Sequence, residues 1–283
     1  MPTADRPVYL TRRVAFSSGH RYWRAGLSPE ANQKLFGELA SPYNHGHNYL
    51  LDVTISGHQD REIGMVVNIK SLDALLREVV VARFDQKSIN DQVPELQDIS
   101  PTVENLILHF RSVLAKTGWL VLDGKTVRLE ALRLEEHPRL WGEWNEESMK
   151  ISLTRTYEFA ASHRLQAPTL SDAENEALFG KCNNPAGHGH NYIVDVTVTG
   201  TPDPVTGMMV DLMALDRAVD ELVVERYDHK NLDVDLPEFQ GKVSTTEALT
   251  VEIFDRLNGN IPATLAAVRL YETGRSSFEV RAG

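Results

Sequence analysis

HGHNYIVDVTV, at residues 188 to 198, carries the strongest structural pattern in the sequence, and its first five residues recur at residues 45 to 49. In both places apolar and polar residues alternate after the tyrosine, which is the period of a half-buried strand. Because residues two apart on a strand project from the same side, His188 and His190 can converge on one point. The sequence therefore predicts, twice, a strand that begins with a converging pair of histidines.

The sequence contains an internal duplication that covers most of the chain. FSSGH, which ends at His20, answers FAASH, which ends at His163, and GMVVN from Gly64 answers GMMVD from Gly207. Both pairs are 143 residues apart, as are the two HGHNY motifs. A period of this length describes two domains, because each copy is large enough to bury its own core.

The copies lose their common spacing towards their ends. RLEE from Arg133 matches RLYE only at a spacing of 136, so the first copy carries seven extra residues, which we expect in a loop near residues 118–125. The Trp-bearing stretch 140–144 lies beyond the last match, and we assign it to the linker region. These limits predict two units, residues 1–146 and residues 147–283.

Each copy has the pattern of a mixed fold. Strand periods flank the histidines, and apolar residues then recur at helical spacing, as at Leu212 and Leu215. A second helix is expected after Thr245, and segments 264–272 and 276–281 are expected to form a hairpin. The sequence predicts an α+β fold, in which each copy is a four-stranded antiparallel sheet with two helices on one face.

Composition excludes several classes of protein. The formal net charge of -11 argues against nucleic acid and anionic membranes as partners, since both require a basic surface. The single cysteine, Cys182, allows no intramolecular disulfide. The N-terminal residues lack the apolar core of a signal peptide, and no run approaches about 20 apolar residues. We expect a soluble, cytoplasmic protein.

Six of the ten histidines fall into two equivalent sets. Three imidazoles with one open position are typical of a catalytic Zn²⁺ site. A histidine pair alone is a weak signal, because hydrogen-bonded histidines explain it equally well, but a third histidine at matched spacing in both copies favours a metal. The predicted ligands are His163, His188 and His190 in the second copy, and His20, His45 and His47 in the first.

The second copy carries FAASHRL, LFGKCNNPAGHGHNY, YDHKNLD, STTEALT and VRLYETG in this order, over nearly all of residues 155–280. These motifs resemble the 6-pyruvoyl-tetrahydropterin synthases and the related 6-carboxytetrahydropterin synthases of the tunnelling fold. The six residues from Cys182 to His188 favour the pyruvoyl branch. The resemblance implies a zinc-dependent lyase that converts 7,8-dihydroneopterin triphosphate to 6-pyruvoyl-tetrahydropterin and eliminates triphosphate.

The resemblance also implies catalytic roles for residues of the second copy. Zinc would bind and polarise the substrate's side-chain hydroxyls. Cys182 would be the general base, and His229, oriented by Asp228, would share the proton of its thiol. Without the resemblance, the cysteine would be read as a small buried residue and the Asp-His pair as an ordinary turn.

Three further residues are implied to contact the substrate. Glu272 would anchor the pterin through two parallel hydrogen bonds, and Thr246 and Glu247 match other pterin-contacting positions. The sequence leaves open which basic residues hold the triphosphate. The candidates by proximity alone are Lys181, Lys230, Arg164 and Arg226.

The first copy departs from the family pattern at the catalytic positions. Leu39 replaces Cys182 and Gln86 replaces His229, so both the base and its activator are missing. The remaining counterparts of site residues are His20, His45, His47, Asp85, Glu104 and Glu136. We predict that the first copy is a degenerate unit without catalysis, and that chains form a homo-oligomer, such as a trimer of two-unit chains.

Three rival functions stay open. A 6-carboxytetrahydropterin synthase of the deazaguanine pathway would share the zinc, the cysteine and the substrate. A non-catalytic pterin-binding protein would suit the first copy. A generic zinc hydrolase would need a glutamate base close to the ligands in an HExxH arrangement, which is lacking.

Overall fold

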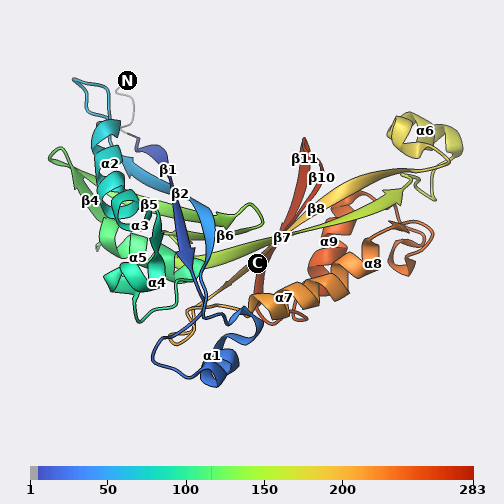
Figure 1. The fold of residues 1–283 in the computed structure, drawn as a ribbon. Helices are drawn as coiled ribbons and strands as arrows, with labels where there is room; N and C mark the ends of the chain where they lie inside the picture. The colour runs from blue at the N-terminus through green and yellow to red at the C-terminus, as the bar shows by residue number, and fades with distance from the viewer. Residues whose placement is uncertain (1–5, 116) are drawn as a thin grey trace. The chain divides into compact units, whose positions relative to one another are not determined.

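A computed structural model describes residues 6–115 and 117–283 of the chain (Figure 1). The chain divides into two compact units, and each combines an antiparallel sheet with several helices, so the predicted α+β class is confirmed. The first unit comprises Met1–Leu153 together with Gly200–Met209, and the second comprises Thr154–Thr199 and Val210–Gly283.

The first unit is built on four long strands with the neighbour order β1-β2-β5-β6. Its strands are β1 Val8–His20, β2 His45–Gly57, β3 Lys87–Ser88, β4 Trp119–Leu122, β5 Lys125–His137 and β6 Leu140–Asn145. Its helices are α1 Pro29–Phe36, α2 Ile69–Leu76, α3 Ala82–Phe84, α4 Ile89–Gln92 and α5 Val103–Leu114. Helices α2, α3 and α5 lie on one side of the sheet (Figure 1). The two-residue strand β3 pairs in parallel with the end of β1.

The second unit repeats this plan with the neighbour order β7-β8-β10-β11. Its strands are β7 Lys150–His163, which begins in the first unit, β8 His188–Gly200, β9 Lys230–Asn231, β10 Thr264–Thr273 and β11 Ser276–Arg281. Its helices are α6 Asp172–Phe179, α7 Leu212–Val219, α8 Glu225–Tyr227 and α9 Thr246–Leu257. The hairpin expected near the C-terminus corresponds to β10 and β11, which are paired antiparallel.

Strand pairing in the first unit brings its histidines together. In the antiparallel pair β1–β2, His20 stands opposite His45 and Ser18 stands opposite His47. Along β2 the alternate residues Tyr49, Leu51 and Val53 are fully buried, as expected for a strand with one face on the core. The end of the strand pair therefore presents the histidines just beyond the buried apolar rows.

Both long helices of the sites begin at a threonine cap. The side chain of Thr102 accepts a hydrogen bond from the main-chain N–H of Asn105, and that of Thr245 accepts one from Ala248. Such caps satisfy main-chain donors that the first helical turn leaves without a partner. The caps fix where α5 and α9 start, and the residues beside them line the candidate sites.

Two assignments from the sequence are wrong. The stretch 140–144, assigned to the linker, lies in strand β6, which pairs with β5. Leu140 and Trp144 are buried, because the alternate residues of this strand face the core. The extra residues near 118–125 do not form a plain loop, since they include strand β4, which extends a hairpin with β5.

Further elements were not predicted. Helices α1 and α6, between the first histidine and the HGH motif of each copy, are absent from the predicted order. The helix that starts at Leu212 continues through a π-helical segment, Asp220–Val224, and the first unit has the equivalent segment Arg77–Val81. None of the helices among the described residues has the length and apolar character needed to span a membrane.

Candidate metal centre

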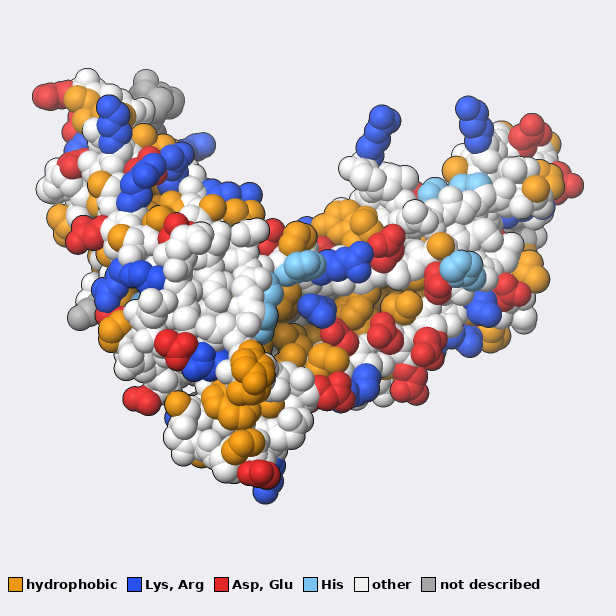
Figure 2. Space-filling view, viewed as in Figure 1, with side chains coloured by type: hydrophobic (Ala, Val, Ile, Leu, Met, Phe, Trp, Pro, Cys, Tyr) orange, Lys and Arg blue, Asp and Glu red, His pale blue; other side chains and the backbone are white. Residues whose placement is uncertain are grey.

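Three imidazoles of the second unit converge at the end of the β7–β8 strand pair. The candidate ligand atoms of His163, His188 and His190 all lie within 4.8 Å of one another. The ring centroid of His163 is 4.6 Å from that of His188 and 5.3 Å from that of His190. Figure 2 shows histidine side chains, in pale blue, reaching the surface of this unit. The geometry is that of a site that could hold one metal ion.

The hydrogen bonds of these histidines leave ligand atoms free. The Nδ1 atom of His163, which is buried, lies 2.7 Å from the carbonyl oxygen of Ser244, so Nδ1 donates its proton and Nε2 keeps a lone pair. Among the described residues, Nε2 of His163, Nε2 of His190 and Nδ1 of His188 have no hydrogen-bond partner. Unpartnered buried nitrogens are rare unless an ion or water completes them, which fits a metal.

Burial favours the neutral form of two of these histidines, His188 and His190. Burial lowers the pKa of His188, and the neighbouring His163 and His190 lower it further. Burial also lowers the pKa of His190, against the opposing effect of Glu272. A metal ligand must be deprotonated, so these shifts prepare both imidazoles for an ion at neutral pH.

Two of the predicted substrate-binding residues lie beside the triad. An Oε1 atom of Glu272, on β10, is 3.6 Å from Nε2 of His190 and 3.9 Å from Nε2 of His163. The same Oε1 accepts a 2.7 Å hydrogen bond from the hydroxyl of Thr246, at the start of α9. Glu247 is exposed, unlike its buried neighbour Thr246. The structure therefore brings Thr246 and Glu272 together with the histidines, but not Glu247.

The predicted proton-transfer residues occupy two places. Cys182 is half-buried in the 3-10 turn Gly180–Asn183, six residues before His188. His229 is exposed, and its Nδ1 lies 2.7 Å from Oδ2 of Asp228. Among the described residues, no hydrogen bond joins the thiol of Cys182 to His229. The predicted Asp-His pair is present in the geometry, and the pairing of thiol and imidazole is not.

Main-chain contacts hold the Asp-His pair in place. The N–H of Ala160 donates to Asp228, and this bond, followed by the contact with His229, holds the pKa of Asp228 below its usual value. His229 has a left-handed φ of 56°, and its N–H donates to the carbonyl of Ala160. Its counterpart Gln86 has a φ of 57°, so the unusual backbone belongs to the fold and not to the imidazole.

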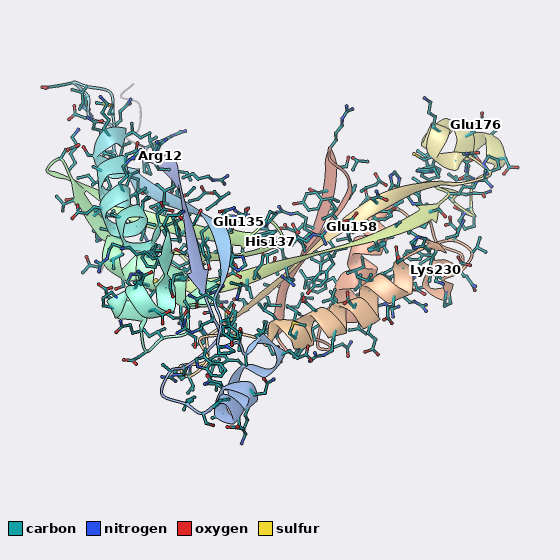
Figure 3. All side chains as sticks on the ribbon, in the orientation of Figure 1. Arg12, Glu135, His137, Glu158, Glu176 and Lys230 are labelled. Carbon is teal, nitrogen blue, oxygen red and sulfur yellow. The ribbon has the colours of Figure 1, made fainter. Side chains whose placement is uncertain are left out.

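His229 and His190, one of the three candidate metal ligands, both line an open depression of about 670 Å³. His190, Lys230 and Asn231 are among the residues that line it. Lys230, labelled in Figure 3, is the first residue of β9, and of the four candidate triphosphate contacts it is the one that lines this depression. Arg226, another of the candidates, is already paired with Glu238 at 2.5 Å.

The first unit has an equivalent triad. The ligand atoms of His20, His45 and His47 also lie within 4.8 Å of one another, and Nδ1 of His20 is 2.9 Å from the carbonyl of Pro101. Burial, followed by the charge of His45, lowers the pKa of His20 to about 3. Burial is also the main cause that lowers the pKa of His47 to about 4. These residues could hold a metal as well.

The two units agree at one glutamate position near the triad and differ at another. Glu136 lies 3.7 Å from Nε2 of both His20 and His47, as Glu272 does in the second unit at similar distances. Glu104 is buried, and its Oε1 accepts a 2.9 Å hydrogen bond from the main-chain N–H of Met209. Glu104 is the counterpart of Glu247 in the repeat. In the first unit, therefore, this carboxylate already accepts a hydrogen bond from a main-chain group, whereas Glu247 is exposed.

Sequence reasoning missed the groups that orient the candidate metal ligands. The carbonyls of Ser244 and Pro101 are main-chain atoms, which carry no side-chain signal. Tyr49 was also missed, and its hydroxyl donates a 3.4 Å hydrogen bond to Glu136. The tyrosine of the repeated HGHNY motif was the signal that could have found it.

Two α+β units, each with three converging imidazoles at the end of a strand pair, define a duplicated protein with two candidate metal centres. A family model described as 6-pyruvoyl tetrahydropterin synthase matches the chain twice, over residues 9–147 and 152–283. The chain belongs to the 6-pyruvoyl tetrahydropterin synthase family, and the prediction of a lyase of this type is confirmed at family level.

The relatives described next each match less than half of this chain. The human 6-pyruvoyl tetrahydrobiopterin synthase is 52% identical over 125 residues, which cover 44% of this chain and 86% of the human protein. A putative 6-carboxy-5,6,7,8-tetrahydropterin synthase of Archaeoglobus fulgidus is 34% identical over 99 residues, 35% of this chain and 73% of that protein. The solved Caenorhabditis elegans 6-pyruvoyl tetrahydropterin synthase has 39% identity and a TM-score of 0.46, covering 47% of this chain and 96% of that chain.

Proposed function

We propose that the second unit converts 7,8-dihydroneopterin triphosphate to 6-pyruvoyl-tetrahydropterin with elimination of triphosphate, and that the reaction depends on zinc. The supporting observation is the convergence of His163, His188 and His190, with their unpartnered nitrogens, next to Glu272. A histidine triad with an open position is the ligand set of catalytic zinc. In this proposal residues 147–283 act as the complete synthase unit.

Three nitrogen donors and no thiolate in the triad suit zinc among the common divalent ions. When bound, Zn²⁺ supplies Lewis-acid polarisation of the substrate's side-chain oxygens, which acidifies the neighbouring C–H bonds. His163 holds its ring fixed through Ser244, so its Nε2 is preorganised towards the other two imidazoles.

Cys182 and His229 are the proposed proton carriers. A thiol with a pKa near 8.5 is a weak base at neutral pH unless a neighbour takes its proton. Asp228 accepts from Nδ1 of His229, which leaves Nε2 of His229 free to receive that proton. Since Cys182 and His229 are not bonded in the described unit, their pairing requires movement of the 180–183 turn or supply of one residue by another copy.

Substrate contacts follow from charge and position. Glu272 has a carboxylate that can accept two parallel hydrogen bonds from the amino group and ring N–H of a pterin. Thr246 donates to that carboxylate and so orients it. Glu247 is available for a further pterin contact, and Lys230 is placed to meet the triphosphate from the depression that also contains His229.

The first unit, residues 1–146, is proposed to lack catalysis. Leu39 and Gln86 stand where the second unit has Cys182 and His229, so neither proton carrier is present. Its triad could still bind zinc, and its role would be structural, within a homo-oligomer of two-unit chains. This assignment predicts that the chain has two metal sites and one kind of active site.

Product analysis tests the proposed reaction. The purified chain is incubated with 7,8-dihydroneopterin triphosphate, and triphosphate, 6-pyruvoyl-tetrahydropterin and acetaldehyde are measured. Release of triphosphate with the pyruvoyl product supports the proposal. Release of acetaldehyde would assign the chain to the 6-carboxytetrahydropterin synthases, and binding of the pterin without any product would make it a pterin-binding protein.

A further inference from the structure

The turn Gly180–Asn183, which carries Cys182, is tied to the chain that leaves His163. The main-chain N–H of Leu165 donates a 2.9 Å hydrogen bond to the carbonyl of Cys182. The side-chain nitrogen of Asn183 donates back to the carbonyl of Leu165 at 2.7 Å. Because Leu165 follows a candidate metal ligand by two residues, these bonds set where the turn stands relative to the triad.

Arg164 makes two further bonds to the turn. Its Nε atom donates to the carbonyl oxygen of Asn183 at 3.0 Å, and its Nη2 atom donates to the side-chain oxygen of the same residue at 3.2 Å. A guanidinium group can make such a forked contact because its N–H donors are fixed in one plane. Asn183 is buried, and both polar atoms of its side chain are thereby hydrogen-bonded. Arg164 and Asn183 together form a clamp on the turn.

The arginine of the clamp is also held from the side of the metal ligands. Its main-chain N–H donates to Oδ2 of Asp233 at 2.6 Å, and Oδ1 of Asp233 accepts the hydroxyl of Ser244 at 2.6 Å. The carbonyl of Ser244 is the acceptor for Nδ1 of His163. The chain of bonds therefore runs from the group that orients a candidate metal ligand, through a carboxylate and an arginine, to the turn that carries the thiol.

The first unit keeps the arginine but not the clamp. Arg21 is the counterpart of Arg164 at the spacing of 143, and its guanidinium donates two hydrogen bonds to Asp91, at 2.6 and 2.7 Å. Ala40, the counterpart of Asn183, has no side-chain group that could donate or accept a hydrogen bond. The unit that lacks the cysteine therefore also lacks the clamp.

The turn of the first unit approaches the matching place through main-chain atoms. The N–H of Ser41 donates to the carbonyl of Tyr22, the counterpart of Leu165, at 3.4 Å. In the second unit the carbonyl of Leu165 accepts the 2.7 Å bond from the side chain of Asn183. The approach of the turn is thus common to both units, whereas the side-chain clamp belongs to the unit with the cysteine.

Two further exchanges change the rest of the network. Pro101 stands where the second unit has Ser244, and a proline side chain has no hydroxyl to donate. Asn90 stands where the second unit has Asp233, and its Oδ1 accepts the main-chain N–H of Arg21 at 2.9 Å. This one bond is common to both units, while the side-chain bonds on either side of it are not.

We propose that Arg164 and Asn183 are positioning residues for the thiol of Cys182. The clamp fixes the place of the thiol relative to the metal triad, so that the base lies within reach of a substrate held there. A general base needs this precision, because a misplacement of about 1 Å can lower the rate by about 10²-fold. The link to catalysis rests on the proposed function, whereas the clamp itself does not.

The lone cysteine allows a direct test, because alkylation by iodoacetamide reports on Cys182 alone. Asn183→Ala removes the side-chain contacts of the asparagine and introduces the residue found in the first unit. Arg164→Lys keeps the positive charge but loses the forked contact. Arg21→Lys is the matched control in the first unit. Circular dichroism confirms that each variant folds, and elemental analysis measures its zinc.

Cys182 should be alkylated about 3–10-fold faster in Asn183→Ala and in Arg164→Lys than in wild type, because loss of about one hydrogen bond releases a half-buried thiol. Arg21→Lys should react at the wild-type rate. The double variant should react no faster than the faster single variant, since both substitutions remove the same contact. Zinc content should equal that of the wild type throughout.

Kinetics with 7,8-dihydroneopterin triphosphate separate positioning from substrate binding. In both variants of the clamp, kcat should fall by on the order of 10–10² while KM changes little. A direct contact between Arg164 and the triphosphate would instead raise KM in Arg164→Lys and leave the alkylation rate unchanged, which would overturn the proposal.

Alkylation at the wild-type rate in both variants would also overturn it, as would additive effects in the double variant or an equal change in Arg21→Lys. The alkylation measurements need no substrate. Faster alkylation as described, in a chain whose wild type shows no turnover, would count against the proposed function and leave the clamp intact.

Discussion

The Nδ1 atom of His163 lies 2.7 Å from the main-chain carbonyl oxygen of Ser244. The bond ties the orientation of a candidate metal ligand to the segment that leads into α9, and α9 also carries Thr246 beside Glu272. The first unit repeats the relationship between His20 and Pro101 at 2.9 Å. Both copies thus keep the second bond that orients a candidate metal ligand, although just one keeps the proposed proton carriers.

Metal content is expected to separate the two triads. The wild-type chain should bind about two zinc ions, because three neutral imidazoles converge in each unit. His163→Ala and His20→Ala should each bind one, since each removes one ligand of one triad. Elemental analysis of the purified chains measures this, and turnover should disappear in His163→Ala alone. Two zinc ions retained in both variants would show that the triads are not the metal sites.

Replacement of the lone cysteine should stop chemistry without loss of metal. Cys182→Ala is expected to lower kcat by on the order of 10²–10⁴, the usual contribution of a general base. Leu39→Ala is the matched control at the equivalent position of the first copy, and it should leave kcat unchanged. The measurements are steady-state kinetics and zinc content. Wild-type kcat in Cys182→Ala would remove the thiol from the mechanism.

Removing the charge of Asp228 is expected to lower catalysis, whereas the same change at its counterpart in the first unit is not. Asp228→Asn disturbs the 2.7 Å contact that orients the imidazole, so kcat should fall by on the order of 10². Asp85→Asn is the control, because Asp85 accepts the N–H of Ser17 as Asp228 accepts that of Ala160, but it has Gln86 as its neighbour. Equal losses in both variants would indicate a purely structural role.

The sequence predicted the class of fold and the residues of the triads because these depend on local periods and on an internal repeat. The alternation of apolar and polar residues along a strand can be recognised from neighbouring residues alone. Comparison of the two copies then shows which motifs recur. The unusual backbone of His229 was not predicted. Gln86, at the equivalent position of the first copy, has a φ of 57°, so this conformation recurs with the fold and does not depend on the residue type.

Other features depend on contacts distant in the sequence. Helix α6 has a complete capping box between Ser171 and Glu174, but few of its residues are buried, so it lacks the apolar period by which helices are recognised. Strand β6 has no counterpart in the repeat alignment, and for this reason it was assigned to a linker. The bond between Glu104 and Met209 joins residues 105 positions apart, and no sequence pattern indicates it.

Burial of Glu104 is expected to make stability depend on pH. Burial raises the pKa of Glu104 above 4.5, against the opposing hydrogen bond from Met209, so the folded state binds its proton more tightly than the unfolded state. The wild type should therefore lose stability as the pH rises from about 4.5 through the folded pKa. Glu104→Gln has no titratable group at this position, so its unfolding free energy should not fall for this reason as the pH rises.

The measurement is the difference in unfolding free energy between Glu104→Gln and wild type at several pH values. The difference should shift in favour of Glu104→Gln as the pH rises, with exposed Glu225→Gln as the control. A constant difference would mean that Glu104 titrates alike in the folded and unfolded states. Glu104→Ala, which leaves the N–H of Met209 without an acceptor, should cost about 1–3 kcal/mol.

The last prediction concerns a substitution in strand β6. A linker would tolerate an added methyl group, whereas a strand packed in the sheet would be destabilised by it. A Cβ atom on Gly142 would lie 2.7 Å from the side chain of Ile107 and 2.8 Å from that of Val103, both on α5. Gly142→Ala should therefore lower the unfolding free energy by about 1–3 kcal/mol, the usual cost of overpacking. Gly26→Ala, where a Cβ meets nothing within 4 Å, is the control and should change little. Chemical denaturation measures both variants, and a silent Gly142→Ala would show that this stretch does not pack on α5.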